Sequence, residues 1–211
     1  MFLRADSLDG ALKHLDRAGI SFVAMSAFFT NLQHTAVVPD NDLTSKGEMR
    51  IKRPRSGQLL GWIDFVKPDP KTVALNGRTV SILLPKMNTV EVYDLGKHQG
   101  LLEQFFLLGF GTSRHDLEAA YTTSYGGTEV VNGEPATRII LISKKPEVRK
   151  QLSQLELWIS DKTGEPVRQR FNEPNGNFNV FTYLGMKNRS LPDSAFKLKL
   201  PKGVKTVIKN K

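Results

Sequence analysis

The sequence predicts a mainly β protein with a few helices (α+β), in which one large curved antiparallel sheet or barrel makes up most of the fold. Short apolar segments recur along most of the 211 residues, and turn residues separate them. Strands at this spacing are typical of large sheets whose edges are closed or capped. Two segments with helical periodicity interrupt the strands, one near the N-terminus and one near the middle of the chain.

The first element is a helix that begins after Asp6 or Ser7 and continues to about Ala18, because either residue can cap it. Its apolar residues recur at helical spacing and comprise Leu8, Ala11, Leu12 and Leu15. We expect this stripe to pack against a concave surface. Residues 20–38 then predict a long strand or a bent pair of strands, apolar on both faces, so both faces must be covered.

Residues 47–54 read Gly-Glu-Met-Arg-Ile-Lys-Arg-Pro and predict a strand with one charged face. Alternate side chains of a strand point to opposite faces, which places Arg53 on the apolar face of Met49 and Ile51. A buried guanidinium is costly unless it has partners, so an arginine there needs a specific role. The alternative is that the strand ends at Pro54 and Arg53 turns out to solvent.

The remaining strands are joined mainly by short turns. They are expected at residues 59–66, 72–76, 79–84, 89–93, 121–131, 136–143, 154–160, 166–171, 177–186 and 196–200. Asn76-Gly77 is the strongest hairpin signal, because a tight two-residue turn requires positive φ. Asn132-Gly133 and Asn175-Gly176 mark further turns. The pattern predicts roughly ten antiparallel strands.

Residues 96–121 change to helical periodicity and contain an unusually apolar stretch. Its apolar residues are Leu101, Leu102, Phe105, Phe106, Leu107, Leu108 and Phe110. A helix that is apolar nearly all round must be buried on more than one side or face an apolar ligand. The segment is therefore either a plug in the core of the sheet or a lid over a ligand.

Composition favours one domain over residues 1–211 and limits the partners. Cysteine is absent, so neither a disulfide nor a thiolate metal site is possible. The net charge of +9 favours anionic surfaces, but the chain has neither a recognition helix nor a row of base-stacking aromatic residues, so we expect no nucleic acid partner. No apolar segment is long enough to span a bilayer, and the N-terminus lacks a leader, which suggests a cytosolic protein or a mature form.

The residue types of known catalytic sites are not arranged for chemistry. The four histidines have no metal-ligand spacing, and we expect no metal or other cofactor. Ser113, His115 and Asp116 supply the residue types of a hydrolase triad, but a working triad comes from distant segments and no nucleophile elbow is present. The sequence therefore indicates a binding protein and not an enzyme.

Several motifs in order resemble those of the periplasmic outer-membrane lipoprotein carrier family, LolA. They are residues 47–54, Leu75-Asn-Gly-Arg-Thr with its strand ending Leu84-Pro85, Leu157-Trp-Ile followed by residues 161–164, and residues 196–204 with Pro201-Lys-Gly-Val204. The resemblance covers nearly the whole chain and extends to an outer-membrane receptor and a stress-sensing regulator of the same fold. The chain departs from the family in residues 81–84, which lack aromatic residues, and in a lid segment richer in leucine and phenylalanine.

The resemblance implies an unclosed β-barrel whose apolar cavity holds the acyl chains of a lipoprotein under a helical lid. It matches Arg53 to an arginine that latches the lid, and it matches the lid to residues 96–108 with the N-terminal helix. Together with strand alternation, it predicts a lipid-binding cavity lined by Leu102, Phe105 and Phe106 of the lid and by Met49, Ile51, Trp62, Ile82 and Leu157 of the sheet.

The function implied is a monomeric periplasmic carrier, in mature form, that delivers lipoproteins to the outer membrane. Its partners would be an acylated lipoprotein or other lipid, an inner-membrane release complex and an outer-membrane receptor. Two alternatives stay open. One is a receptor or sensor of the same fold that does not hand cargo onward, and the other is an enzyme that acts on lipid.

Overall fold

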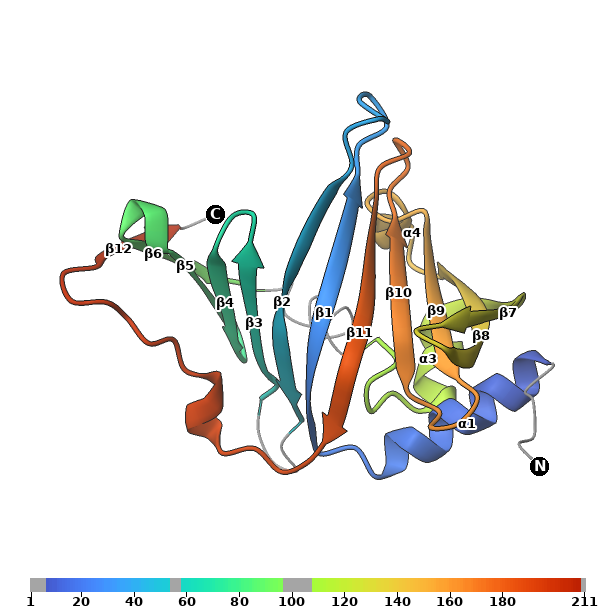
Figure 1. The fold of residues 1–211 in the computed structure, drawn as a ribbon. Helices are drawn as coiled ribbons and strands as arrows, with labels where there is room; N and C mark the ends of the chain where they lie inside the picture. The colour runs from blue at the N-terminus through green and yellow to red at the C-terminus, as the bar shows by residue number, and fades with distance from the viewer. Residues whose placement is uncertain (1–6, 54–57, 97–107, 210–211) are drawn as a thin grey trace. The chain divides into compact units, whose positions relative to one another are not determined.

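The computed structural model describes residues 7–53, 58–96 and 108–209, and its main feature is one sheet of twelve strands. The strand order is β12-β6-β5-β4-β3-β2-β1-β11-β10-β9-β8-β7, so the sheet is not closed (Figure 1). The strands are β1 (Ala24–His34), β2 (Leu43–Lys52), β3 (Leu60–Lys67), β4 (Lys71–Asn76), β5 (Thr79–Leu84), β6 (Thr89–Asp94), β7 (Tyr121–Val131), β8 (Glu134–Ser143), β9 (Gln154–Ser160), β10 (Pro166–Asn172), β11 (Phe178–Asn188) and β12 (Lys205–Lys209).

The described helices are short apart from the first. They are α1 (Leu8–Ile20), α3 (Arg114–Ala120) and α4 (Pro146–Arg149), with 3-10 turns η1 (Pro85–Met87) and η3 (Asp193–Phe196). Ser7 caps α1, as predicted, because its Oγ accepts a hydrogen bond from the backbone N–H of Gly10 at 3.1 Å. The predicted mainly β fold with few helices is confirmed.

The C-terminal part of the sheet corrects the sequence prediction. Residues 196–200 were expected to form a strand, but Phe196 is the last residue of η3 and residues 197–200 follow it outside any strand. The last strand is instead β12, which pairs in parallel with β6, whereas the other pairs of defined register are antiparallel. Lysines at both ends of β12 obscured it, because alternation with charged residues also fits an exposed tail.

Two predicted hairpins are present, with different turns. Val131 pairs with Glu134, and both Asn132 and Gly133 have positive φ, as a type I′ turn requires. Asn76 pairs with Thr79, so the turn residues are Gly77 and Arg78, and of these two only Gly77 has positive φ. That arrangement suits a type II′ turn, whose first central residue is glycine.

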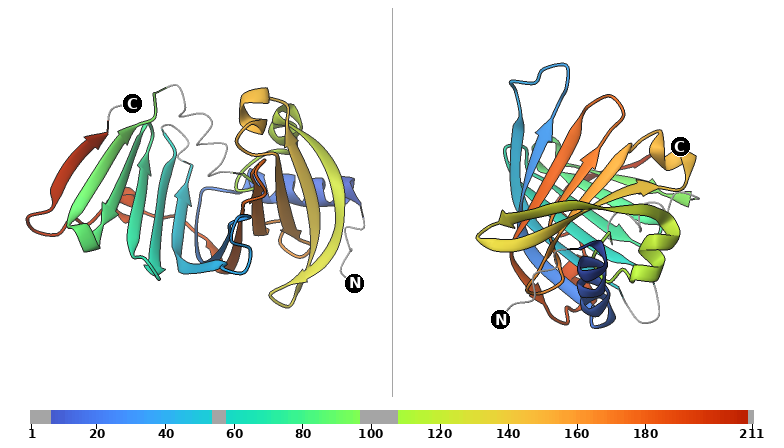
Figure 2. Two further views of the ribbon diagram at one scale, coloured as in Figure 1. Left: turned by 90° about the horizontal axis from the view of Figure 1, so that it is seen from above. Right: turned by 90° about the vertical axis from the view of Figure 1, so that its right-hand side faces the viewer.

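The chain divides into two compact units. Unit 1 comprises the described residues within 1–21, 30–44 and 109–184, and unit 2 those within 22–29, 45–108 and 185–211. In unit 1, α1 crosses β8 and β9 (Figures 1 and 2). Leu12 and Leu15 of α1 are fully buried, which confirms that the apolar stripe packs inward. Any Cβ at Gly164, between β9 and β10, would overlap the carbonyl oxygen of His14, so this close approach requires glycine.

Candidate functional site

One face of unit 2 carries a row of apolar side chains across four strands. The register pairs Met49 with Ile63, Ile63 with Val73, and Val73 with Ile82. Directly paired residues share a face of the sheet, so these four side chains lie side by side. Ile51, Phe65, Leu75 and Val80 belong to the same face by alternation and register, and the eight residues are called the apolar face of unit 2.

The apolar face of unit 2 is only partly exposed. Ile51 and Leu75 are fully buried and Met49 is 5% exposed, whereas Ile63, Val73 and Ile82 are half-buried. Phe65 packs edge-on against Phe29 with ring centroids 5.2 Å apart. Half-buried apolar side chains in a row offer a surface that an aliphatic chain can cover.

Polar groups border this face at β6 and β12. Ile82 pairs with Glu91, and Val80 pairs with Tyr93. The Tyr93 hydroxyl donates to Glu91 at 2.6 Å, and the Lys209 ammonium lies 3.3 Å from the same carboxylate. These contacts lower the pKa of Glu91, chiefly through the Tyr93 hydrogen bond. The apolar surface therefore ends at a charged pair.

Unit 1 has its own apolar face, and it is closed by packing. Leu157 is fully buried, and a Cβ at Gly109 would come 3.4 Å from its Cδ1. The other buried apolar residues of β8 and β9 on this face are Ile139, Leu141, Leu155 and Ile159. The Tyr183 hydroxyl donates to Gln169 within the same face, and burial raises the pKa of Tyr183.

The residues predicted to line one cavity belong to two units and, within unit 2, to both faces of the sheet. Met49, Ile51 and Ile82 lie together on the apolar face of unit 2. Trp62 pairs with Arg50 and so lies on the opposite face, which corrects its grouping with Met49. The error arose because alternation was counted within each strand without knowing the register between strands. Leu157 belongs to unit 1.

The lid residues Leu102, Phe105 and Phe106 lie outside the described residues, as do all of residues 97–107. The proposed latch residue Arg53 is described. Strand β2 ends at Lys52, and Arg53 is exposed, with its backbone N–H donating to the carbonyl of Val23 at 3.0 Å. The lid-latching role of Arg53 stays a prediction.

Sequence reasoning missed the part played by Arg50 and Lys52 on the opposite face of β2. The Arg50 guanidinium lies 4.1 Å from the ring centroid of Trp62 and donates to the Ala195 carbonyl at 3.0 Å. The Lys52 ammonium donates to the Leu191 carbonyl at 2.8 Å. Both side chains thereby fasten the segment around η3 to the sheet. Their alternation with apolar residues predicted only a solvent-exposed face of the strand, because the segment that covers them is distant in sequence.

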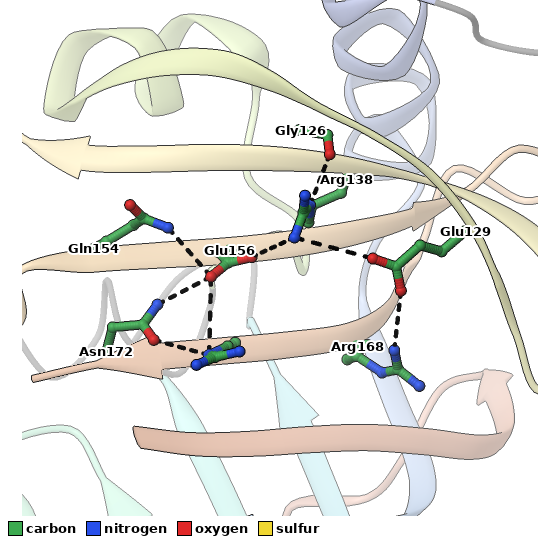
Figure 3. Close-up of polar contacts among 8 residues, drawn as sticks. Gly126, Glu129, Arg138, Gln154, Glu156, Arg168 and Asn172 are labelled. Carbon is green, nitrogen blue, oxygen red and sulfur yellow. Dashed lines mark hydrogen bonds and ion pairs between the residues drawn. The ribbon is translucent and has the colours of Figure 1, made fainter. Parts of the chain in front are cut away.

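Unit 1 carries a second feature that the sequence did not reveal, a charged network on the face of β8–β10 opposite its apolar face. Glu156 is only 5% exposed and accepts hydrogen bonds from Arg138 at 3.2 Å and Asn172 at 3.1 Å (Figure 3). Arg138 also donates to the Gly126 carbonyl at 2.8 Å. The guanidinium of Arg138 lies 5.7 Å from the ring centroid of Trp158.

The three residues of the types found in a hydrolase triad, Ser113, His115 and Asp116, do not form a catalytic site. The Ser113 hydroxyl caps α3 by accepting the backbone N–H of Asp116 at 3.0 Å. His115 is exposed, with its Nδ1 3.6 Å from Asp116 Oδ1. The arrangement lacks the hydrogen bond between nucleophile and base that acyl transfer uses.

Comparison with known proteins identifies the family. The profile of the outer membrane lipoprotein carrier protein LolA matches residues 24–199. This chain belongs to the LolA family. The match spans both units of this LolA-family chain and confirms the resemblance seen in its motifs. No match was found among curated protein sequences.

Solved structures with the LolA-like fold share little sequence with this chain. An uncharacterized conserved protein from Thermus thermophilus has a TM-score of 0.58 and 14% identity, over 94% of this chain and 99% of that one. MucB has a TM-score of 0.55 and 16% identity, over 93% of this chain but only 64% of MucB. Lipoprotein LppX from Mycobacterium tuberculosis has a TM-score of 0.51 and 12% identity, over 88% of this chain and 99% of LppX.

These comparisons give this chain the fold of the lipoprotein carriers. Among its described residues, no helix combines the length and the apolar character needed to cross a membrane.

Proposed function

We propose that this protein binds the acyl chains of lipoproteins on the apolar face of unit 2 and delivers them to the outer membrane. The observation that carries the proposal is the row of apolar side chains from Met49 to Ile82 in a chain of the LolA family. An acyl chain with about fifteen methylenes gains on the order of 12 kcal/mol on leaving water, at about 0.8 kcal/mol per CH₂. A carrier must cover such a chain and still release it.

The roles of individual residues follow from their places in the chain. Met49 and Ile82 would contact the acyl chains. Ile51 and Leu157 are fully buried, so they would contact a ligand only after the side chains that cover them move away. Leu102, Phe105 and Phe106 would form the underside of a lid that Arg53 holds closed. A lid held by a few hydrogen bonds suits reversible release better than a tightly packed core does.

The carrier would work as a monomer in the periplasm and would catalyse no reaction. It would receive cargo from an inner-membrane release complex and pass it to an outer-membrane receptor. The energy for loading would come from that complex, so the carrier itself would need no cofactor.

A sensor or receptor that keeps its ligand is the second candidate. It is favoured by the similarity to MucB, which has been crystallised with MucA from Pseudomonas aeruginosa. MucB in that complex matches this chain with a TM-score of 0.50. MucB is longer, and this chain spans 61% of it in that complex. A stable protein partner, without transfer of lipid, would distinguish this role from carriage.

The test is to express the chain with a periplasmic leader, purify it gently and identify co-purifying acylated species by mass spectrometry. We expect triacylated lipoproteins. Ile82→Glu should abolish co-purification, because it places a carboxylate on the apolar face of unit 2. Ser81→Glu is the matched control, since Ser81 is half-buried on the other face of the same strand.

Free phospholipid alone would favour a different lipid-transfer role, and a co-purifying protein without lipid would favour the sensor. Equal recovery of lipoproteins with wild-type protein and the Ile82→Glu variant would place the acyl chains away from this face.

A further inference from the structure

A groove lies on the face of unit 2 opposite its apolar face, and nothing proposed above uses it. The groove has a volume of about 460 Å³ and lies between strands β2–β5 and residues 194–199. Trp62 and Leu83 line the groove on the side of the strands. Lys197, Leu198 and Lys199 line it on the side of the C-terminal segment. Its volume is within the range of about 300–1,000 Å³ that is typical of ligand sites.

The groove has an excess of positive charge. Arg50, Lys197 and Lys199 line it, and no acidic residue does. Three carboxylates beside the lining residues already have partners. Glu48 pairs with Arg50 at 3.0 Å, Asp193 pairs with Lys52 at 2.7 Å, and Asp64 accepts a hydrogen bond from the Thr72 hydroxyl at 2.6 Å. Lys197 and Lys199 are exposed and form no ion pair with the described residues. Their charge is therefore available to an anionic ligand.

The C-terminal wall of the groove is fixed in place. The Arg50 guanidinium donates to the Ala195 carbonyl, and Lys52 donates to the Leu191 carbonyl. Phe196 is buried in a cluster with Ala24 and Leu191, against which Trp62 packs. These contacts hold the wall at a defined separation from the strands, so the groove is a built feature and not a gap beside a loose segment.

The same wall presents unpaired backbone. Lys197 is extended, with φ −85° and ψ 138°. The backbone groups of Leu198, Lys199 and Leu200 form no hydrogen bonds with described residues. Extended backbone with unpaired N–H and C=O groups is a template for a further strand. A lipid headgroup would leave such groups unused, whereas a peptide would pair with them.

We propose that this groove binds an extended segment of a partner protein in which carboxylate side chains flank an apolar one. The apolar side chain would pack on Trp62 and Leu83, and the carboxylates would meet Lys197, Lys199 and the exposed edge of Arg50. The peptide backbone would pair with residues 198–200. This protein-docking site lies on the opposite face of unit 2 from the proposed lipid surface and does not depend on lipid carriage.

The test begins by panning a phage-displayed library of random decapeptides against the immobilised full chain. We expect enrichment of peptides that combine aspartate or glutamate with an apolar residue. The most enriched peptide, labelled with fluorescein, is then titrated by fluorescence anisotropy. In the double variant K197E/K199E its affinity should fall roughly tenfold or more, and wild-type affinity should weaken as salt is raised.

The matched control is K150E/K162E, which makes the same change in net charge at exposed lysines of unit 1 that do not line the groove. It should leave peptide affinity unchanged, and the thermal unfolding midpoints of both double variants should match that of the wild type. Enrichment of peptides without acidic residues, or equal affinity for K197E/K199E, would overturn the proposal. A further contrary result would be that no peptide is enriched and that the protein pellets with phosphatidylglycerol vesicles only when Lys197 and Lys199 are present. The site would then bind a lipid headgroup.

Discussion

At the scale of single residues, the side chain of Arg53 would control the release of cargo. We expect Arg53→Leu to bind lipoprotein but to deliver it poorly, because losing charge-assisted hydrogen bonds would shift the opening equilibrium by roughly tenfold or more. Delivery is measured as transfer of radiolabelled lipoprotein to outer-membrane vesicles.

Arg78→Leu is the matched control for that experiment. Arg78 is also exposed, and its contact with Asp94 at 3.3 Å is a surface ion pair of little energetic value. Full delivery by Arg53→Leu would contradict the latch, whereas loss of lipid binding by this variant would place Arg53 in the binding surface itself.

Glu165, between β9 and β10, gives a pH-dependent prediction. Burial raises the pKa of this carboxyl above its ordinary value of 4.5. A hydrogen bond with Thr163 lowers the pKa, but by less than burial raises it. The folded protein thus binds the proton more tightly than the unfolded chain does. The free energy of unfolding is therefore lowered as pH rises from below 4.5 through the folded pKa.

We expect Glu165→Gln to have a higher unfolding midpoint than the wild type at neutral pH, because the variant has no charge to desolvate. The difference should vanish at about pH 3, where both side chains are neutral. Glu147→Gln, at an exposed position in α4, should show no such trend. A constant difference at all pH values would mean that packing, and not ionisation, explains the effect.

At the scale of elements, the charged network fastens three adjacent strands through Glu156 of β9. Arg138 reaches it from β8, and Asn172 reaches it from β10. Glu156→Ala should lower the free energy of unfolding by about 1–3 kcal/mol, since a buried acceptor is lost while its partly exposed donors can still be hydrated. Urea denaturation measures the change.

The control is Glu147→Ala, which should lie within about 0.5 kcal/mol of the wild type, as exposed substitutions usually do. Glu156→Gln should be milder than Glu156→Ala, because its amide oxygen still accepts from Asn172. If Glu156→Ala were as stable as the wild type, the network would contribute nothing net to pairing between these strands.

The individual strands could be read from the sequence, but their mutual register could not. Asn132-Gly133 fixes both turn and pairing locally, which is why that hairpin was predictable. The position of Trp62 depends on pairing with Arg50 across a connection whose length does not specify register. The prediction of a strand at residues 196–200 was wrong, because alternation alone cannot distinguish a strand from an extended segment that packs without a backbone partner.

At the scale of the whole molecule, binding of an acylated ligand should be visible as stabilisation. A ligand that binds only the folded state adds about 2.7 kcal/mol to the free energy of unfolding at a hundredfold excess over its Kd. We expect a tripalmitoylated lipopeptide to raise the unfolding midpoint of delipidated protein in a concentration-dependent manner. The same peptide without acyl chains should have no effect, and equal shifts with both would indicate that the peptide part is bound instead.

The family and its general fold were predictable because the motifs from Gly47 to Val204 occur in the expected order, and the profile match over residues 24–199 confirms the family. The groove beside Lys197 and Lys199 was not predictable, because it is created by packing between β2–β5 and a segment more than a hundred residues later in the chain. Contacts of that kind leave no local pattern in sequence.

The parallel pairing of β12 also has a consequence for how this protein behaves in concentrated solution. Without β12, the unpaired edge of β6 would display alternating N–H and C=O groups together with Val90 and Val92, which is the kind of edge that recruits strands from other molecules. A five-residue strand with Lys205 and Lys209 at its ends replaces that edge with one that is short and positively charged. Short edge strands that carry lysine are poor templates for a further strand, so we expect β12 to oppose edge-to-edge association between molecules.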